Sequence, residues 1–165
     1  MSYFKENCKQ TNSNQSIGIC DDPPPSERPA YLDTSEENEW ITEIENPEEK
    51  EVTFYAIDNC IKIIKPNTED DKESTCDGVF IVEKDLTFVE LKDRNSKRWL
   101  KKAREQIENT HRLFKNNKDL ESFEKIDALV SNKQRPQANV GNMNHIQQFK
   151  DNTGLTLRVQ RKIKI

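Results

Sequence analysis

The chain has 165 residues, of which 32% are hydrophobic and 34% are charged, and its mean hydropathy is −1.00. This length fits one modest domain, whose small core must be concentrated in a few apolar runs. No run is long enough to span a bilayer and no signal peptide follows Met1, so we expect a cytoplasmic protein without a membrane partner.

The first 30 residues are polar and contain the triple proline Pro23–Pro25. This composition predicts a disordered or extended tail over residues 1–30, followed by a single domain over residues 31–165.

The four cysteines have wide, irregular spacings, which argues against a zinc module. Cys60 and Cys76 lie in or beside apolar runs and are predicted to be small buried hydrophobic residues. Cys8 and Cys20 lie in the polar tail, where nothing in the sequence supports a redox or metal role for them.

Three elements are predicted before residue 65. Thr34 and Glu37 have the spacing of a capping box, and Trp40, Ile41 and Ile44 share a helical face, so a short helix is expected over residues 34–46. The β-branched and aromatic run at 52–57 predicts a strand. The next run, 60–64, is expected to be a second strand, with a helix as the alternative.

Two apolar runs at 78–82 and 86–92 are separated by polar residues and predict a β-hairpin. Asp77 precedes the first run, while Glu90 and Lys92 lie inside the second. Burying charged side chains is costly unless they are paired or bind a metal. The three residues therefore indicate a carboxylate-based metal site.

The register of this hairpin decides whether the three side chains meet. A turn at Glu83–Lys84 would set Asp77 opposite Glu90, whereas a turn at Lys84–Asp85 would set Asp77 opposite Lys92. Side chains on a strand alternate between faces, so either register puts all three on one face, within about 4.5–8 Å. A three-residue turn would separate them.

Apolar and small residues then recur every three or four positions and predict a helix over about residues 97–116. Its first two turns carry Lys97, Arg98, Lys101, Lys102 and Arg104. Positive charge at a helix N-terminus opposes the helix dipole at a cost of up to about 1 kcal/mol, which suggests contact with a phosphate backbone. A solvated helix face is the alternative.

Three more elements are predicted: a strand at 126–130, a helix at 143–152 and a half-buried strand at 155–165. The cationic face of the last strand fits either a protected edge or a phosphate contact. The polar loop between the first two contains Lys133 and Arg135 and either contacts nucleic acid or only connects them. His111 and His145 are expected to be structural or surface residues.

The pattern Asp77…Glu90-Leu91-Lys92 resembles the PD-(D/E)xK phosphodiesterase superfamily, the restriction-endonuclease-like nucleases. The resemblance covers roughly residues 52–130, and Cys76 stands where the family name has proline. It implies an α/β (α+β) fold with a restriction-endonuclease-like core, in which helices flank a central mixed sheet of about four to five strands.

The resemblance also implies residue roles. Asp77 and Glu90 would hold Mg²⁺, or Mn²⁺ as a substitute, with help from the Leu91 carbonyl, and Lys92 would position or activate the attacking water. Some members place a glutamine near the metal from this helix, which gives Gln106 that role. A surface glutamine is the alternative.

A third carboxylate ligand is also expected. Asp58 is one candidate, because it ends an apolar run next to the predicted sheet. One of Glu45, Glu48 or Glu49 is another.

Charge is segregated along the chain: residues 1–50 hold 4 basic and 12 acidic residues, whereas residues 93–165 hold 17 and 8. A nuclease needs a cationic surface beside an acidic metal site, and this distribution supplies both. The expected function is a Mg²⁺-dependent endonuclease acting on DNA, in restriction or phage defence. The expected nucleic-acid contacts are Lys97, Arg98, Lys101, Lys102, Lys133 and Arg135.

Two other functions are compatible with the sequence. The first is a nuclease-like subunit that binds nucleic acid or assembles a complex without catalysis; the small size favours it, because small nucleases often need a homodimer or a partner protein. The second is an acidic interaction protein whose residues 1–50 bind a basic partner.

Overall fold

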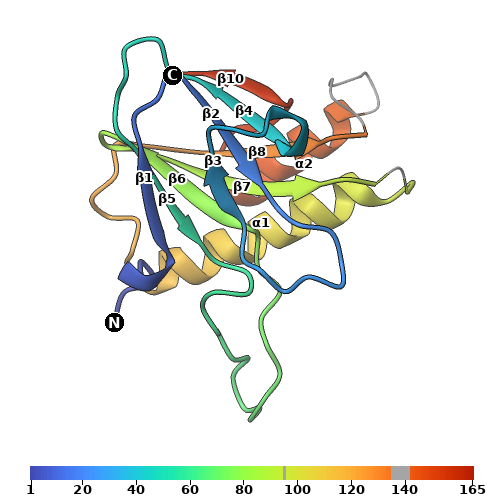
Figure 1. Cartoon of the computed structure of the whole chain (residues 1–165). Helices are drawn as coiled ribbons and strands as arrows, with labels where there is room; N and C mark the ends of the chain where they lie inside the picture. The colour runs from blue at the N-terminus through green and yellow to red at the C-terminus, as the bar shows by residue number, and fades with distance from the viewer. Residues whose placement is uncertain (95, 135–141) are drawn as a thin grey trace.

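The computed structural model describes residues 1–94, 96–134 and 142–165, which form two β-sheets and two α-helices arranged in three layers (Figure 1). The strands are β1 (Lys9–Asn12), β2 (Ser16–Cys20), β3 (Tyr31–Asp33), β4 (Thr42–Glu45), β5 (Val52–Ala56), β6 (Gly78–Val82), β7 (Asp85–Lys92), β8 (Lys125–Asn132), β9 (Leu157–Val159) and β10 (Lys162–Lys164). The helices are α1 (Trp99–Asn116) and α2 (Met143–Thr153), with short 3-10 turns η1 (Glu6–Cys8) and η2 (Glu37–Glu39). The predicted mixture of α and β structure is confirmed.

The six-stranded sheet has the order β1-β5-β6-β7-β8-β9, and the four-stranded sheet has the order β10-β4-β2-β3. One hydrophobic cluster joins α1 and α2 to one face of the larger sheet. A second cluster joins the smaller sheet to its other face. The helices thus flank only one face of the larger sheet. This sheet has six strands, so the predicted number of four to five strands was too low.

The β6–β7 hairpin confirms the first of the two predicted registers. Val82 pairs with Asp85 across a turn at Glu83–Lys84, and Glu83 adopts a positive φ of 56°. Gly78 pairs with Val89, so the same register sets Asp77 opposite Glu90. From β7 the chain crosses through α1 to β8, which lies parallel to β7.

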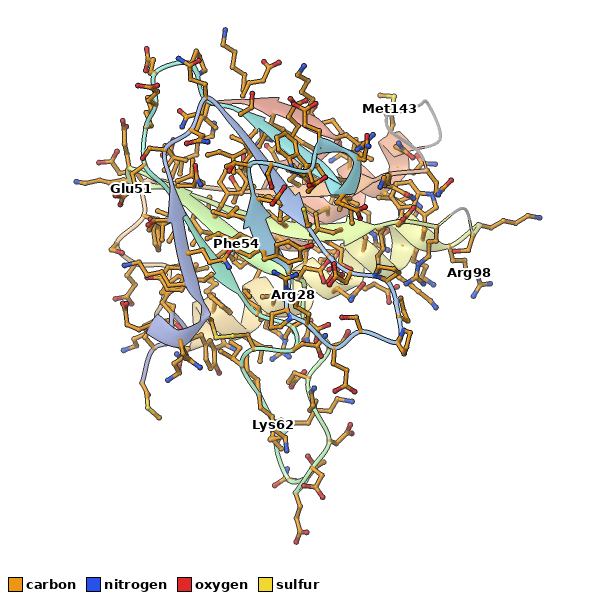
Figure 2. The ribbon with its side chains drawn as sticks, in the orientation of Figure 1. Arg28, Glu51, Phe54, Lys62, Arg98 and Met143 are labelled. Atoms are coloured by element: carbon orange, nitrogen blue, oxygen red, sulfur yellow. A yellow bond between two sulfur atoms is a disulfide. The ribbon has the colours of Figure 1, made fainter. Side chains whose placement is uncertain are left out.

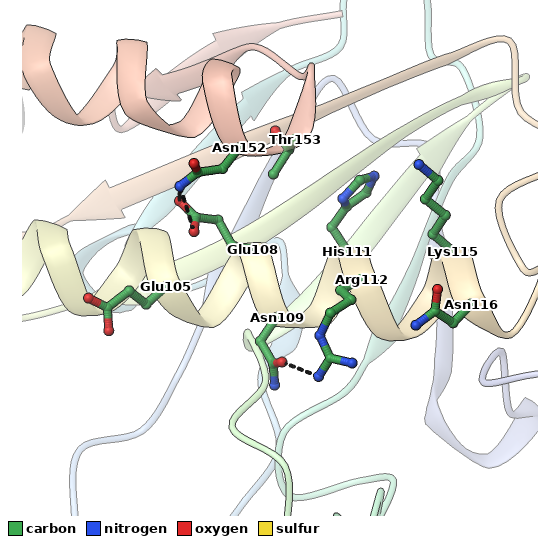
Figure 3. Close-up of a pocket in the computed structure, with 9 residues that line it drawn as sticks. All are labelled: Glu105, Glu108, Asn109, His111, Arg112, Lys115, Asn116, Asn152 and Thr153. Atoms are coloured by element: carbon green, nitrogen blue, oxygen red, sulfur yellow. Dashed lines mark hydrogen bonds between the residues drawn. The ribbon is translucent and has the colours of Figure 1, made fainter.

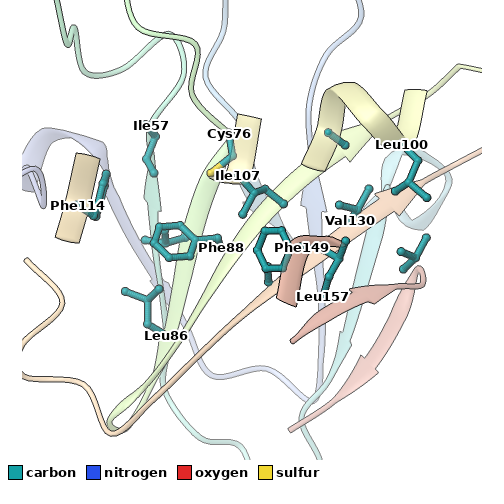
Figure 4. Close-up of a cluster of buried hydrophobic side chains, with 14 of the residues drawn as sticks. Ile57, Cys76, Leu86, Phe88, Leu100, Ile107, Phe114, Val130, Phe149 and Leu157 are labelled. Atoms are coloured by element: carbon teal, nitrogen blue, oxygen red, sulfur yellow. The ribbon is translucent and has the colours of Figure 1, made fainter. Parts of the chain in front are cut away.

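Alternation along β7 decides which face carries the charges. Leu86 and Phe88 belong to the cluster beneath the helices, while Val89 and Leu91 belong to the cluster between the sheets. Figure 4 shows Phe88 packed among residues of this helix-side cluster. Glu90 and Lys92 continue the even-numbered series, so their side chains lie on the α1 face.

Residues 1–30 do not form the predicted disordered or extended tail. β1 pairs with β5 along its whole length, and β2 lies between β3 and β4 in the smaller sheet. Ile17 and Ile19 are fully buried there. The reason for the error is length, because a five-residue strand with two isoleucines is too short to stand out in a polar segment.

Three other predicted elements are corrected. Residues 34–46 form η2 and β4 rather than a helix, because Thr42 and Ile44 alternate toward the core. Residues 60–64 form no strand; Ile64 makes only an isolated bridge to Lys72. The single strand predicted at 155–165 is two strands in two sheets, and between them the Arg161 guanidinium donates to the carbonyls of Trp40 and Ile41.

Cys8 and Cys60 form a disulfide and Cys60 is only partly buried, which corrects the prediction that Cys60 is a small buried hydrophobic residue. Cys76 is buried, as predicted, and its thiol is free. Disulfides persist mainly in oxidising compartments, so the cytoplasmic location stays a prediction. Neither helix in the described ranges has the length and apolarity needed to cross a membrane.

Candidate functional site

Asp77, Glu90 and Lys92 come together where β6 begins and β7 ends. The Leu91 amide donates to Asp77 Oδ2 at 2.7 Å, and the Asp77 amide donates to Glu90 Oε1 at 3.1 Å. The three side chains are buried, with Glu90 only 2% exposed. Backbone hydrogen bonds across the hairpin therefore hold both carboxylates in fixed positions.

Lys92 links this pair to helix α1. Its Nζ atom lies 2.8 Å from Glu90 Oε2 and donates to Gln106 Oε1 at 2.9 Å. Gln106 Nε2 in turn donates to the Thr75 carbonyl at 3.3 Å, just before Asp77 in the chain. The structure thus places the part-buried Gln106 beside Lys92, and its position near a metal stays a prediction.

Burial makes the two carboxylates hard to ionise together. It raises the pKa of Asp77 well above its usual value, and the neighbouring charge on Glu90 raises it further. The pKa of Glu90 is also raised by burial, although Lys92 opposes that shift. One ammonium cannot balance two buried carboxylates, so the centre has a deficit of positive charge.

This charge deficit suits a hard divalent cation, which prefers oxygen ligands. Asp77 uses Oδ2 for the Leu91 amide, and the described part of the chain gives Oδ1 no hydrogen-bond donor. Leu91 itself lies opposite Ser131 in the β7–β8 ladder, and the role of its carbonyl as a ligand stays a prediction. Two carboxylates are ligands of the kind that Mg²⁺ or Mn²⁺ takes, and binding of either ion here stays a prediction.

Asp58 is close to this centre along the backbone, and its charge acts on Asp21. It follows Ile57, whose amide donates to the Asp77 carbonyl at 2.9 Å. The other predicted candidates are engaged elsewhere: Glu45 pairs with Lys162 at 2.9 Å and Glu48 pairs with Lys50 at 3.3 Å. Glu49 lies in a turn with a positive φ of 53°.

Sequence reasoning missed Asp21. It follows β2 in the smaller sheet, and its pKa is raised to about 7 by burial and by the charges on Asp77 and Asp58. The Asp21-Asp22 pair was the only signal, and it fell in a segment predicted to be a tail. The Asp21 carboxylate, which follows a strand of the smaller sheet, therefore lies close enough to the hairpin for the charge on Asp77 to raise its pKa.

Within the described ranges, no three histidine, cysteine, aspartate or glutamate side chains converge closely enough to hold a metal ion. Asp77 and Glu90 supply two carboxylates, and Asp58 and Asp21 lie near them without completing the set. A third protein ligand would require a side-chain movement or a backbone oxygen.

The predicted cationic surface lies immediately beyond the C-terminal end of β7. Lys97, Arg98, Lys101 and Lys102 are exposed there, and Arg98 projects outward from the start of α1 (Figure 2). Lys133 is half-buried and donates to the Asn38 carbonyl. Arg135 lies outside the described residues.

A groove of about 570 Å³ lies between α1 and α2, and Asp77, Glu90 and Lys92 do not line it (Figure 3). His111 lines this groove and meets the ring of Phe88 edge-on, with ring centroids 6.0 Å apart. Its packing fits the structural role predicted for it. Glu108 in the same groove accepts a hydrogen bond from Asn152.

No protein-family model, curated protein or solved structure matches this chain.

The titration of Asp21 predicts how stability depends on pH. Its folded pKa of about 7 exceeds the ordinary value of 3.8, so the native state binds more protons between these values. The stability of the metal-free protein should therefore fall as pH rises from about 4 to 7. Asp21→Asn should stabilise it at pH 8 by roughly 1–2 kcal/mol, after allowing for solvent screening.

Urea unfolding at pH 5 and pH 8 tests this expectation, with Asp22→Asn as the matched control. Asp22 accepts a hydrogen bond from Tyr31 and pairs with Arg28, so its replacement should destabilise the protein at both values. Equal stability of Asp21→Asn and wild type at pH 8 would contradict the proposed charge repulsion.

Proposed function

We propose that this protein is a metal-dependent nuclease that hydrolyses phosphodiester bonds in DNA. The observation that carries the proposal is the buried group of Asp77, Glu90 and Lys92 on two paired strands, next to an exposed basic surface. The elements on which the family resemblance depends, a charged hairpin followed by a long helix, correspond to β6, β7 and α1.

Asp77 and Glu90 would hold Mg²⁺ or Mn²⁺, with the Leu91 carbonyl as a further ligand and Asp58 or Asp21 as the third carboxylate. A divalent ion held there supplies a nucleophile at neutral pH and offsets charge on the phosphoryl oxygens. Burial excludes competing water from the two carboxylates, and the hairpin hydrogen bonds fix their orientation.

Lys92 has the geometry to hold the attacking water. An ammonium group has three N–H donors. Two of them are directed to Glu90 Oε2 at 2.8 Å and to Gln106 Oε1 at 2.9 Å. The third donor remains for a water molecule, and Gln106, itself anchored on the Thr75 carbonyl, acts as a positioning residue.

The basic residues at the start of α1 would bind the phosphate backbone. Replacing Lys97 and Lys102 together with glutamate should weaken DNA binding at least about 10-fold and reduce the slope of log affinity against log salt by about 2. Fluorescence anisotropy at several salt concentrations measures both. Lys84→Glu, an exposed lysine at the opposite end of the hairpin, is the control and should change neither.

The experiment that tests the proposal is cleavage of a panel of linear, nicked, branched and single-stranded DNAs, and RNA, by wild type and Glu90→Gln. Cutting that needs Mg²⁺ or Mn²⁺, stops with a chelator and disappears in Glu90→Gln would support a nuclease. Glu124→Gln, a surface control, should cut like wild type. Equal activity of wild type and Glu90→Gln would reject the assigned site.

A second candidate is a non-catalytic nuclease-like subunit that binds nucleic acid or assembles with a partner protein or a second copy. The observation in its favour is that the described residues do not bring three metal-ligating side chains together. DNA binding without cutting under any of these conditions would favour it.

A further inference from the structure

A disulfide lies at the base of the long loop, residues 57–77, that connects β5 to β6 and ends at Asp77. The loop leaves β5 and ends at β6, and its two ends are joined by the hydrogen bond from the Ile57 amide to the Asp77 carbonyl, 2.9 Å long. Three residues after Ile57, Cys60 is bonded to Cys8 of η1, with Cα atoms 6.0 Å apart. The covalent link therefore lies beside a hydrogen bond to the backbone of Asp77.

The tied segment is one tight turn that contains Asp58. The Cys60 amide donates to the Ile57 carbonyl at 3.1 Å, and Asn59 between them has a positive φ of 63°. Fixing Cys60 thus fixes the turn and with it the position of Asp58. Apart from the link, the turn is held by its hydrogen bonds and by the packing of Ile57 in the helix-side cluster.

The disulfide is open to a reductant. A cavity of about 150 Å³ reaches both cysteines and is also lined by Lys9, Arg28 and Tyr31. Cys60 is partly buried whereas Cys8 is fully buried, so Cys60 is the more accessible of the two cysteines to an incoming thiolate. Lys9 and Arg28 supply positive charge, which stabilises thiolates.

The same cavity borders the second segment near the site. Arg28 stacks on the Tyr31 ring at 3.5 Å and lies 3.7 Å from Asp22. The Tyr31 hydroxyl donates to Asp22 at 3.0 Å, next to Asp21. The residues around the disulfide therefore contact both segments that bring additional carboxylates toward Asp77.

We infer that the Cys8–Cys60 disulfide is a redox control of the candidate site, which holds Asp58 and Asp77 in place when oxidised and releases the loop when reduced. This inference rests on the proposed nuclease function. In the reaction, a thiolate of a dithiol reductant attacks Cys60 Sγ and Cys8 leaves as a thiolate. The second thiol of the reductant then displaces Cys60. The reductant becomes a disulfide, and two electrons and two protons pass to the cysteines.

The test compares oxidised wild type, the same protein reduced with dithiothreitol, and the double variant Cys8→Ala/Cys60→Ala, below the unfolding temperature of all three. Two quantities are measured: hydrogen exchange of the Ile57 amide and the rate of Mn²⁺-dependent cleavage. Reduction should accelerate exchange and slow cleavage, each at least about 10-fold, since local opening controls both. The double variant should have the exchange and cleavage rates of reduced wild type, and dithiothreitol should change neither rate.

A destabilised control separates this effect from a general loss of stability. Ile163→Ala removes a buried side chain from the smaller sheet and keeps the disulfide. It should retain the oxidised cleavage rate and the response to reductant. Unchanged Ile57 exchange or an unchanged cleavage rate, in protein whose Cys8 and Cys60 are shown by alkylation to be reduced, would overturn the redox inference. No cleavage by oxidised wild type would instead overturn the nuclease proposal, and Ile57 exchange would still decide whether the disulfide holds the loop.

Discussion

Asp77→Asn should abolish metal-dependent cleavage and, at the same time, stabilise the metal-free protein. The buried Asp77 carboxylate lies against Glu90 with a raised pKa, so ionising both at neutral pH costs free energy. Asparagine removes that charge and can still accept the hydrogen bond from the Leu91 amide. We expect a loss of at least about 10³-fold in cleavage rate. We expect a gain on the order of 1 kcal/mol or more in stability at pH 8.

Single-turnover cleavage and urea unfolding in the presence of a chelator measure these two effects. Asp85→Asn is the matched control, since Asp85 is exposed at the other end of β7. Mn²⁺ should raise the unfolding temperature of wild type and leave that of Asp77→Asn unchanged, because ligand binding to the native state alone stabilises it. A variant that lost stability and kept activity would contradict the assignment of Asp77.

Gly18→Ala should cause the largest loss of stability among conservative single substitutions in the smaller sheet. A Cβ atom on Gly18 would lie 2.1 Å from Cγ of Trp40, with two other indole atoms within 2.3 Å. The indole cannot easily move away, because its Nε1 donates to Asp33 Oδ2 at 2.8 Å. Overpacking of this kind costs about 3 kcal/mol or more when the neighbour is fixed.

Urea unfolding of Gly18→Ala beside Gly154→Ala separates crowding from backbone strain. A Cβ on Gly154 would meet nothing within 4 Å, but this residue has a positive φ of 78° at the end of α2. Its replacement should cost only about 1 kcal/mol. A loss below that value in Gly18→Ala would mean that Trp40 is free to move.

The parts of the fold that could be predicted are those in which the chain repeats a pattern long enough to recognise. The apolar stripe of α1 extends over 18 residues, and the β6–β7 hairpin has two apolar runs with a polar turn between them. Strand alternation was sufficient to place Asp77, Glu90 and Lys92 on one face. The resemblance put Gln106 near a metal site, whereas its hydrogen bond with Lys92 was not predicted.

The elements that were missed depend on contacts between distant parts of the chain. The burial of β2 requires the partners β3 and β4, and the break between β9 and β10 is stabilised by Arg161 reaching the backbone of Trp40. Asp21 lies near the hairpin only because the second sheet packs against the first. The disulfide joins residues 52 positions apart, a pairing that spacing alone cannot specify.

Buried charge in a small hydrophobic core is the feature that most needs a functional explanation. Charged side chains at such positions reduce stability, and proteins retain them mainly where function requires it. Lys92 is only 6% exposed and contacts both Glu90 and the helix residue Gln106, so its ammonium is the group that connects the carboxylates to the proposed hydrolysis.

The most direct test of the proposed function is the single-turnover cleavage rate of Lys92→Met compared with wild type, at saturating Mg²⁺ and with DNA affinity measured in parallel. Methionine retains most of the buried volume of lysine and removes the ammonium group. If Lys92 acts in hydrolysis, we expect a rate at least about 10³-fold lower, with DNA affinity within about 3-fold of wild type. Cleavage at the wild-type rate by folded Lys92→Met would contradict it.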